Sequence, residues 1–365
     1  DHMAATVDAI RAKLQSLVDP WTGRDYVTGK EARNIRVEGD KVLVDIQLGY
    51  PAKSVMGEVR DRVAAALREV PEVGSVEVNV TMKIVAHQTQ RGVKLIEGVR
   101  NVIAVASGKG GVGKSTVAVN LALALAAEGA QVGILDADIY GPSQPLLLGL
   151  QGKKPQSPDG KSIEPMENHG VQAMSIGFLI DAEQAVAWRG PMATGALEQL
   201  LRDTRWKDLD YLIVDMPPGT GDIQLTLAQK VPVTGAVIVT TPQDIALLDA
   251  RKGLKMFEKV SVPILGIVEN MGMHVCTNCG HEEHVFGAGG GERMAADYGV
   301  ALLGSLPLDI RIREHADAGT PTVVADPDSR PSQIYRDIAR RVAVKVADLA
   351  KDASTVFPKI VIQKT

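Results

Sequence analysis

A glycine-rich segment with two lysines and a serine at fixed spacing is the strongest chemical signal in the chain. Residues 108–115 read G-K-G-G-V-G-K-S and match the phosphate-loop pattern G-x-x-x-x-G-K-[ST]. Glycines let backbone N–H groups turn towards phosphate oxygens, because a Cβ would block the approach. In such a loop Lys114 reaches the β- and γ-phosphates and the Ser115 hydroxyl ligates Mg²⁺. The predicted nucleotide-binding residues of this segment are Gly108, Lys109, Gly110, Gly111, Val112, Gly113, Lys114, Ser115 and Thr116.

Carboxylates follow two apolar segments further along the chain. Asp136 and Asp138 come directly after an apolar run, and Asp215 ends another and begins the sequence D-M-P-P-G. The carboxyl ends of parallel strands open onto the same crevice as the phosphate loop. We therefore expect Asp136 and Asp215 to join the nucleotide site, with Asp215 as the Walker B residue that orients Mg²⁺-bound water. The loop at residues 217–221 is then placed to respond to the γ-phosphate.

The chain has two cysteines, Cys276 and Cys279, and they are three positions apart. Two thiolates do not complete a four-coordinate iron or zinc site. Three arrangements remain open. Two protomers can supply four thiolates to one bridging iron–sulfur cluster; one chain can hold Zn²⁺ with His281 and His284 added; or the pair can be a redox dithiol. The spacing favours the bridging cluster, because the zinc set is tighter than usual finger patterns and no thioredoxin-like pattern surrounds the pair.

The elements that must position these residues follow from the hydrophobic pattern. From residue 101 onward, short apolar segments alternate with helical patterns. Strands are predicted over residues 101–106, 131–136, 171–176, 210–215, 235–240 and 264–268, and helices over 114–127, 192–203, 222–230, 244–259, 290–298 and 331–350. This alternation predicts an α/β fold with a doubly wound, mostly parallel sheet covered on both faces.

The first part of the chain has a separate pattern. It predicts a small α/β domain over residues 4–86, with a helix, a hairpin, a second helix capped by Ser54 and a final strand. The predicted division of the chain is this small domain, a polar linker at 87–98, the nucleotide-binding domain at 99–350 and a C-terminal tail at 351–365.

Composition narrows the class of protein. The chain has 365 residues, 45% of them apolar and 23% charged, which is ordinary for a globular protein. Its net charge is −4 and it has no dense Lys/Arg run, so nucleic acid is not the expected partner. No apolar run approaches the roughly 20 residues that span a bilayer, and the first residues lack a signal pattern. We expect a cytoplasmic location and no membrane partner, and the scarcity of cysteine fits a reducing compartment.

The phosphate loop, with its extra lysine, resembles the deviant Walker A motif of the class that contains the nitrogenase iron protein, MinD and ParA. The resemblance implies that Lys109 crosses a dimer interface to the other subunit's nucleotide. It also implies that Asp138, rather than Asp136, positions the attacking water, and that Asn270 contacts adenine. No Asn-Lys-x-Asp guanine motif follows Asn270, which favours ATP over GTP. The implied catalytic residues are Lys109, Lys114 and Asp138.

Longer motifs narrow the resemblance to the Mrp/ApbC family of ATP-binding iron–sulfur cluster carriers. They are D-A-D-I-Y-G-P-S at 136–143, W-R-G-P-M at 188–192, D-M-P-P-G-T-G-D at 215–222 and C-T-N-C-G-H-E-E-H at 276–284. The similarity spans about residues 98–345. Residues 4–86 resemble the small domain of iron–sulfur assembly factors. That domain often has a cysteine before its second helix, whereas residues 49–54 here read G-Y-P-A-K-S.

This resemblance implies a slow, dimer-coupled ATP hydrolase that uses ATP and Mg²⁺. It would carry a [4Fe–4S] cluster bound by Cys276 and Cys279 between two copies of the chain, with cluster donors and apo iron–sulfur proteins as partners. Two alternatives stay open on the sequence. One is a MinD/ParA-like positioning ATPase, which needs no metal ligand. The other is a redox ATPase that keeps its cluster and transfers electrons.

Overall fold

The computed structural model describes residues 4–87, 93–284 and 289–356. The chain divides between Val85 and Ala86 into two compact units, close to the predicted boundary at residue 86. Parts of two predicted segments lie outside the described residues, namely 88–92 of the linker and 357–365 of the tail. Among the residues that the structure describes, no helix is long and apolar enough to cross a membrane.

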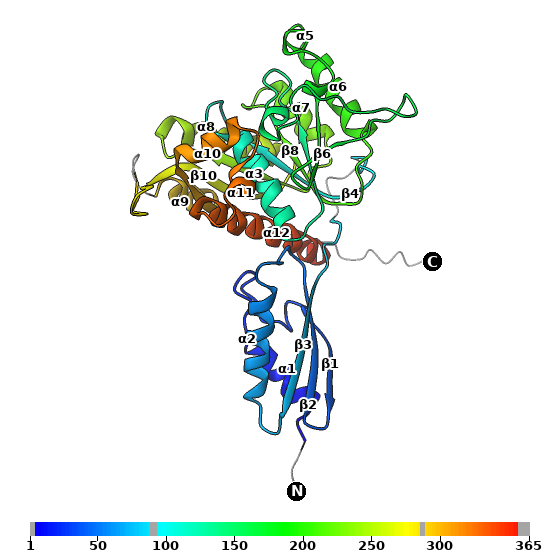
Figure 1. Cartoon of the computed structure of the whole chain (residues 1–365), viewed down its shortest axis with the longest axis vertical. Coiled ribbons are helices and arrows are strands. Elements are labelled where there is room, and N and C mark those ends of the chain that lie inside the picture. The colour runs from blue at the N-terminus through cyan, green and yellow to red at the C-terminus, as the bar shows by residue number, and fades with distance from the viewer. Residues whose placement is uncertain (1–3, 88–92, 285–288, 357–365) are drawn as a thin grey trace, which may run out of the picture. The chain divides into compact units, whose positions relative to one another are not determined.

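The first unit is a three-stranded sheet with two helices. Its strands are β1 (Ala32–Glu38), β2 (Lys41–Leu48) and β3 (Ser75–Met82); β1 and β2 are antiparallel, and β2 and β3 are parallel (Figure 1). Alternate residues of β2 are buried, as expected for a strand with one face on a core. The helices are α1 (Val7–Gln15) and α2 (Met56–Arg68). The predicted cap is wrong in detail, because α2 has Val55 rather than Ser54 at its N-cap.

The second unit is built on a larger sheet. In spatial order its strands are β11 (Glu282–Glu283), β10 (Ile264–Val275), β9 (Gly235–Thr240), β4 (Val99–Ala106), β8 (Leu209–Asp215), β5 (Val132–Asp136), β7 (Val171–Ser175) and β6 (Met166–Asn168), and β12 (Leu302–Leu308) also pairs with β10. Among the described strands of this sheet, only β6 and β11 pair in the antiparallel sense. The predicted doubly wound, mostly parallel sheet is therefore confirmed.

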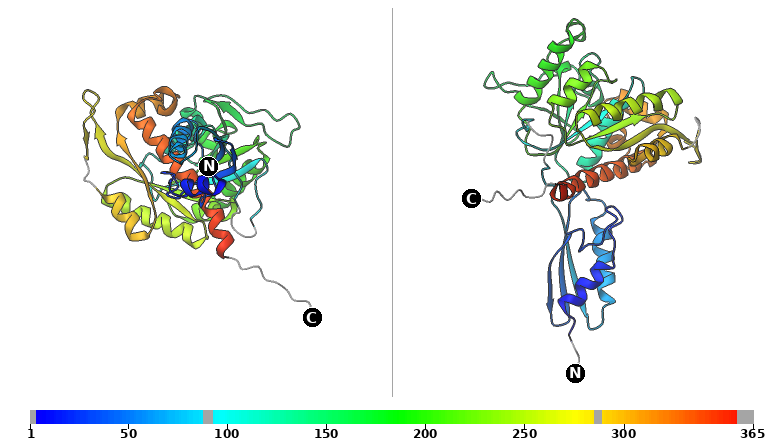
Figure 2. Two further views of the ribbon diagram at one scale, coloured as in Figure 1. Left: turned by 90° about the horizontal axis from the view of Figure 1, so that it is seen from below. Right: turned by 180° about the vertical axis from the view of Figure 1, so that it is seen from behind.

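The helices of this unit form two groups. One contains α3 (Lys114–Ala127), α4 (Gln144–Leu147), α10 (Ile310–Asp317), α11 (Thr322–Ala325) and α12 (Arg330–Val356). The other contains α6 (Gly190–Asp203), α7 (Asp222–Lys230), α8 (Asp244–Lys259) and α9 (Gly290–Tyr298), with the short α5 (Ala182–Val186) before α6. Helices lie on both sides of the sheet (Figure 2). The central strands are consequently buried on both faces; every residue of β5, β7 and β9 is buried.

Two elements run further than the pattern predicts. Strand β10 continues past residue 268 to Val275, and α12 continues past residue 350 to Val356. Strand β12 and helix α10 are not predicted by the sequence analysis. Gly304 and Pro307 interrupt the apolar pattern of β12, and α10 is short and polar. These extended and missed elements build one side of the site described next.

Candidate functional site

The phosphate loop connects β4 to α3 and lines a pocket of about 230 Å³. Two of its glycines are required by close approach. A Cβ on Gly108 would lie 2.0 Å from the carbonyl oxygen of Asp249. At Gly113, where φ is +77°, a Cβ would lie 2.3 Å from the amide nitrogen of Asn270. Asp138, from the acidic segment that follows β5, also lines this pocket.

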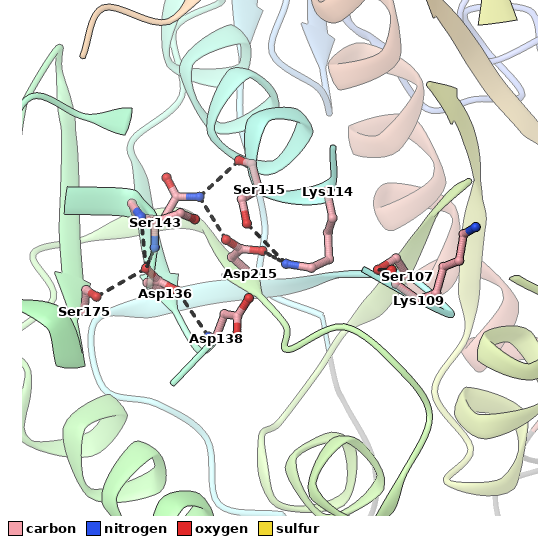
Figure 3. Close-up of polar contacts among 10 residues, drawn as sticks. Ser107, Lys109, Lys114, Ser115, Asp136, Asp138, Ser143, Ser175 and Asp215 are labelled. Carbon is pink, nitrogen blue, oxygen red and sulfur yellow. Dashed lines mark hydrogen bonds and ion pairs between the residues drawn. The ribbon is translucent and has the colours of Figure 1, made fainter. Parts of the chain in front are cut away.

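Lys114, the first residue of α3, is buried and forms an ion pair with Asp215 at the end of β8 (Figure 3). Only 5% of the Lys114 side chain and 0% of the Asp215 side chain is exposed. The Lys114 ammonium also lies 3.4 Å from the Ser115 hydroxyl. The lysine that the sequence predicts to bind phosphates is thus paired with the carboxylate predicted as the Walker B residue.

Asp136 organises the loop that follows β5. Its carboxylate accepts hydrogen bonds from the backbone N–H groups of Ser143 and Gln144, both at 2.9 Å, and from that of Asp138 at 3.1 Å. The Ser175 hydroxyl donates a fourth at 3.3 Å. Burial, and then the charge of Asp215, raises the pKa of Asp136 to about 7. Asp136 therefore acts on the site by shaping the loop that carries Asp138.

Asp138 lies in the pocket wall, partly buried and near the Lys114–Asp215 pair (Figure 3). Burial raises its pKa to about 6; the Lys114 charge opposes this rise and the Asp215 charge adds to it. A carboxylate at this place can orient a water molecule towards a phosphate bound in the loop.

The raised pKa of Asp138 predicts a pH-dependent effect on stability. The folded protein binds this proton more tightly than the unfolded chain, so the contribution is present below about pH 4 and is lost as pH rises through about 6. Asparagine resembles the protonated carboxyl. Asp138→Asn should therefore unfold at higher urea concentration than the parent at about pH 8, and at nearly the same concentration at about pH 3.5. A variant that is less stable than the parent at the higher pH would contradict this assignment.

Lys109 behaves differently from Lys114. Its side chain extends away from the Lys114–Asp215 pair (Figure 3). Its backbone carbonyl accepts a hydrogen bond from the Ser107 hydroxyl at 2.7 Å, which holds the loop, and its side chain is partly exposed. Within the described ranges, no acidic group lies within ion-pair distance of the Lys109 ammonium. The side chain is available to a group outside its own phosphate pocket.

A second and larger cavity, of about 560 Å³, adjoins the phosphate loop at Gly113 and Thr116. Asn270 of β10 lines it and donates a hydrogen bond to the Val112 carbonyl oxygen at 2.9 Å. The opposite wall comes from the end of β12 and from α10, and includes Pro307 and Ile312. The structure thus places Asn270 beside the loop, but its amide nitrogen already holds the loop backbone. The sequence analysis does not predict this wall of the cavity, because it does not predict β12 or α10.

The cysteine pair lies at the turn between β10 and β11. The Cys276 backbone N–H donates to the His281 carbonyl at 2.9 Å, and the Gly280 N–H donates to the Cys276 carbonyl at 2.8 Å. The backbone N–H groups of Cys279 and Asn278 donate to the Cys276 sulfur and lower the pKa of its thiol. Cys276 is partly exposed and Cys279 is exposed, so solvent reaches both cysteines of the turn.

The structure does not bring the two histidines of the zinc alternative to this pair. His281 is exposed, and His284 lies with Nδ1 3.1 Å from the Gly272 carbonyl oxygen. In the described part of the chain, no three His, Cys, Asp or Glu side chains are grouped to hold a metal ion.

Gln144 is a site residue that the sequence analysis missed. From the start of α4, its side-chain amide donates to the Ser115 carbonyl at 3.1 Å and to Asp215 Oδ2 at 2.9 Å. It therefore ties the phosphate loop to the Walker B strand. No sequence signal identifies it, because a glutamine after a serine fits no motif and its partners are 29 and 71 residues away.

Comparisons with known proteins agree with this geometry. A family model described as an NUBPL iron-transfer P-loop NTPase matches residues 98–343, and one described as an iron–sulfur cluster assembly protein matches residues 7–80. The chain is 50% identical over 347 residues to an iron–sulfur cluster carrier protein of Escherichia coli, covering 94% of each chain. It is 53% identical over 251 residues to the mouse iron–sulfur cluster transfer protein NUBPL, covering 68% of this chain and 78% of that one.

Solved structures give the same answer for the fold. A nucleotide-binding protein from Archaeoglobus fulgidus, in complex with ADP, is 38% identical with a TM-score of 0.56, over 64% of this chain and 90% of that one. The cell-division ATPase MinD of Pyrococcus furiosus is 24% identical with a TM-score of 0.50, over 66% of this chain and 98% of that one, and shows the fold alone.

Proposed function

The chain belongs to the NUBPL-type family of iron-transfer P-loop NTPases, which are iron–sulfur cluster carriers that bind ATP. We propose that it holds a [4Fe–4S] cluster between two copies of itself and passes the cluster to apoproteins. One observation carries the proposal. Strand β10 bears Asn270, which is hydrogen-bonded to the phosphate loop, and ends directly before the partly exposed Cys276, with the exposed Cys279 three residues further on. One strand thus connects the proposed nucleotide site with the proposed cluster site.

The cluster is the cargo, and its ligand count requires a second chain. Thiolate is the ligand type that selects iron–sulfur clusters, and a [4Fe–4S] cluster takes four of them. Each chain offers Cys276 and Cys279, with no third ligand grouped beside them in the described ranges. Two chains related by a two-fold axis satisfy the coordination and place the cluster between them. An exposed bridging cluster can leave when such a dimer opens.

The phosphate loop is the part of the chain that would bind and hydrolyse ATP. Members of the P-loop class hydrolyse ATP, and we propose that turnover here is slow and coupled to dimer closure. The residues fit Mg²⁺, because the Ser115 hydroxyl and the Asp215 carboxylate lie at the mouth of the loop beside a buried Ser143 hydroxyl that has no hydrogen-bond partner. The ion would neutralise charge on the phosphates. Lys114 binds the phosphates, and Asp138 orients the attacking water.

Lys109→Ala should separate binding from turnover. Because the Lys109 side chain extends away from the Lys114–Asp215 pair, we propose that its contact forms across the dimer, at charge that develops during hydrolysis. We expect ATP affinity within about tenfold of the parent and loss of most hydrolysis. Calorimetric binding and phosphate release measure the two quantities. Equal loss of binding in Lys109→Ala and Lys114→Ala would show instead that Lys109 works within its own subunit.

Cluster delivery is the direct test of the proposed function. Reconstituted protein is mixed anaerobically with an apo iron–sulfur enzyme, with and without Mg²⁺ and ATP. Transfer appears as loss of iron from the carrier and gain of activity in the recipient. If electrons reach a partner while the iron stays bound, the protein is a redox ATPase. ATP-dependent binding to anionic liposomes or DNA, with no acquisition of iron, would identify a positioning ATPase instead.

We further propose that the first unit is a docking or regulatory module. It matches an iron–sulfur assembly domain, yet both cysteines of the chain lie in the second unit, so it has no thiolate of its own. A cytoplasmic location is part of the same proposal, since free thiolates and a labile cluster require a reducing compartment.

A further inference from the structure

Two buried polar atoms beside the phosphate loop have no hydrogen-bond partner in the described structure. They are the hydroxyl oxygen of Ser143 and the side-chain carbonyl oxygen of Gln144. The great majority of buried polar atoms in proteins are paired, and an unpaired one lowers stability by about 1–3 kcal/mol. Two neighbours of this kind at one place indicate a partner that binds there.

The surrounding contacts fix both side chains in place. Asp136 holds the backbone N–H groups of Ser143 and Gln144, each at 2.9 Å. The Gln144 amide nitrogen donates to the Ser115 carbonyl and to Asp215 Oδ2. Both of these partners are acceptors. If the carboxamide were flipped, its oxygen would face the Ser115 carbonyl oxygen and Asp215 Oδ2 with no hydrogen between them, which is repulsive. The carbonyl oxygen of Gln144 is therefore the atom left without a partner.

The chemistry of the two atoms selects the missing partner. A carboxamide oxygen only accepts hydrogen bonds, so a phosphate oxygen cannot satisfy it. A water molecule whose lone pair is on a metal ion is a hydrogen-bond donor, and Mg²⁺ bound to nucleotide phosphates keeps several such waters. Ser143 lines the phosphate pocket together with Ser115, and Gln144 follows it in the chain with its amide nitrogen on Ser115 and Asp215. The Ser143 hydroxyl can accept from the same water shell.

We propose that Ser143 and Gln144 are positioning residues that bind the water shell of nucleotide-bound Mg²⁺. The inference rests on the proposed ATP binding and deepens it. Through Gln144, the shell would be tied to the phosphate loop at Ser115 and to the Walker B carboxylate of Asp215. Through the backbone contacts of Asp136, it would also be tied to the loop that carries Asp138.

Ser143→Ala tests the proposal, because its effect on the melting temperature should be opposite to that of replacing a hydrogen-bonded serine. Replacing an unpaired buried hydroxyl by an apolar group is neutral or stabilising. The melting temperature of the nucleotide-free protein should stay unchanged or rise. The ratio of the ATP dissociation constant in EDTA to that in Mg²⁺ should fall about tenfold, as for one lost hydrogen bond to a charged group. The dissociation constant in EDTA should not change.

Two controls make the result specific. Ser175→Ala removes a paired hydroxyl, which accepts from the Gly177 N–H at 3.0 Å, and should lower the melting temperature of the free protein. Gln144→Met should reduce the Mg²⁺ effect, whereas Gln172→Met should not. Gln172 is also buried, but both ends of its carboxamide are bonded to the Lys207 backbone, at 3.0 and 2.9 Å.

The outcomes separate this inference from the proposed function. A parent protein that binds no ATP would overturn the ATP-binding proposal itself, and one whose ATP affinity is the same in EDTA and in Mg²⁺ would overturn the water-shell assignment. A Mg²⁺-sensitive parent with unchanged ratios in Ser143→Ala and Gln144→Met would overturn only the water-shell assignment. Weaker binding in EDTA and in Mg²⁺ alike would also overturn it, because the side chains would then act on the nucleotide or on the fold.

Discussion

Replacing Cys276 or Cys279 by alanine should abolish iron–sulfur binding and leave ATP hydrolysis largely intact. Each replacement removes two of the four thiolates of a dimer-bridging cluster, since the change occurs in both chains. The parent, reconstituted anaerobically, should be brown, with a broad absorption near about 400 nm and about four irons per dimer. The cysteine variants should lack this absorption and bind almost no iron. Iron analysis, absorption spectroscopy and phosphate release measure these properties in the same samples.

His281→Ala is the matched control for the cysteine variants. It lies in the same turn and is exposed, and its backbone carbonyl, which the substitution keeps, accepts from the Cys276 N–H. We expect this variant to retain the full iron content and absorption. Colourless protein with one zinc per chain, lost in both His281→Ala and the cysteine variants, would contradict the bridging cluster and restore the single-chain zinc site.

Lys114→Ala should abolish nucleotide binding and also destabilise the nucleotide-free protein. The first effect follows from the loss of the charge that compensates the phosphates. The second follows from the ion pair with Asp215, since 5% and 0% of the two side chains are exposed. Removing one partner of a buried pair leaves an uncompensated charge and typically lowers stability by about 3–5 kcal/mol. Urea unfolding without nucleotide and calorimetry with ATP separate the two effects.

A second substitution distinguishes these two roles of Lys114. In Lys114→Ala/Asp215→Asn the uncompensated carboxylate is gone, so most of the lost stability should return while nucleotide binding stays absent. Lys109→Ala, which alters a partly exposed lysine of the same loop, should leave the stability of the free protein within about 0.5 kcal/mol of the parent. A double variant as unstable as Lys114→Ala would show that the uncompensated Asp215 charge is not the cause of the lost stability.

The elements with an uninterrupted local pattern could be predicted from sequence. Helices α3, α7, α8 and α9 and strand β9 have the predicted bounds, because apolar spacing and a glycine or turn at each end define them locally. Strand β12 and helix α10 could not be found in this way. Strand β12 is stabilised by pairing with β10, and α10 packs against α4, which is more than 150 residues earlier in the chain.

By itself, the sequence determined the chemistry: a phosphate loop over residues 108–115, acidic residues at the ends of β5 and β8, and a single pair of thiolates. Residue type and local spacing suffice for such inferences, because a loop that binds phosphate needs its own glycines and lysine. The tertiary structure alone decided how these parts are connected. It paired Lys114 with Asp215, joined Ser115 to Asp215 through Gln144, and placed Asn270 and Cys276 on and just after one strand. Those contacts join residues up to 101 positions apart, and hydrogen bonds at that separation follow from the order of strands in the sheet, which no local pattern contains.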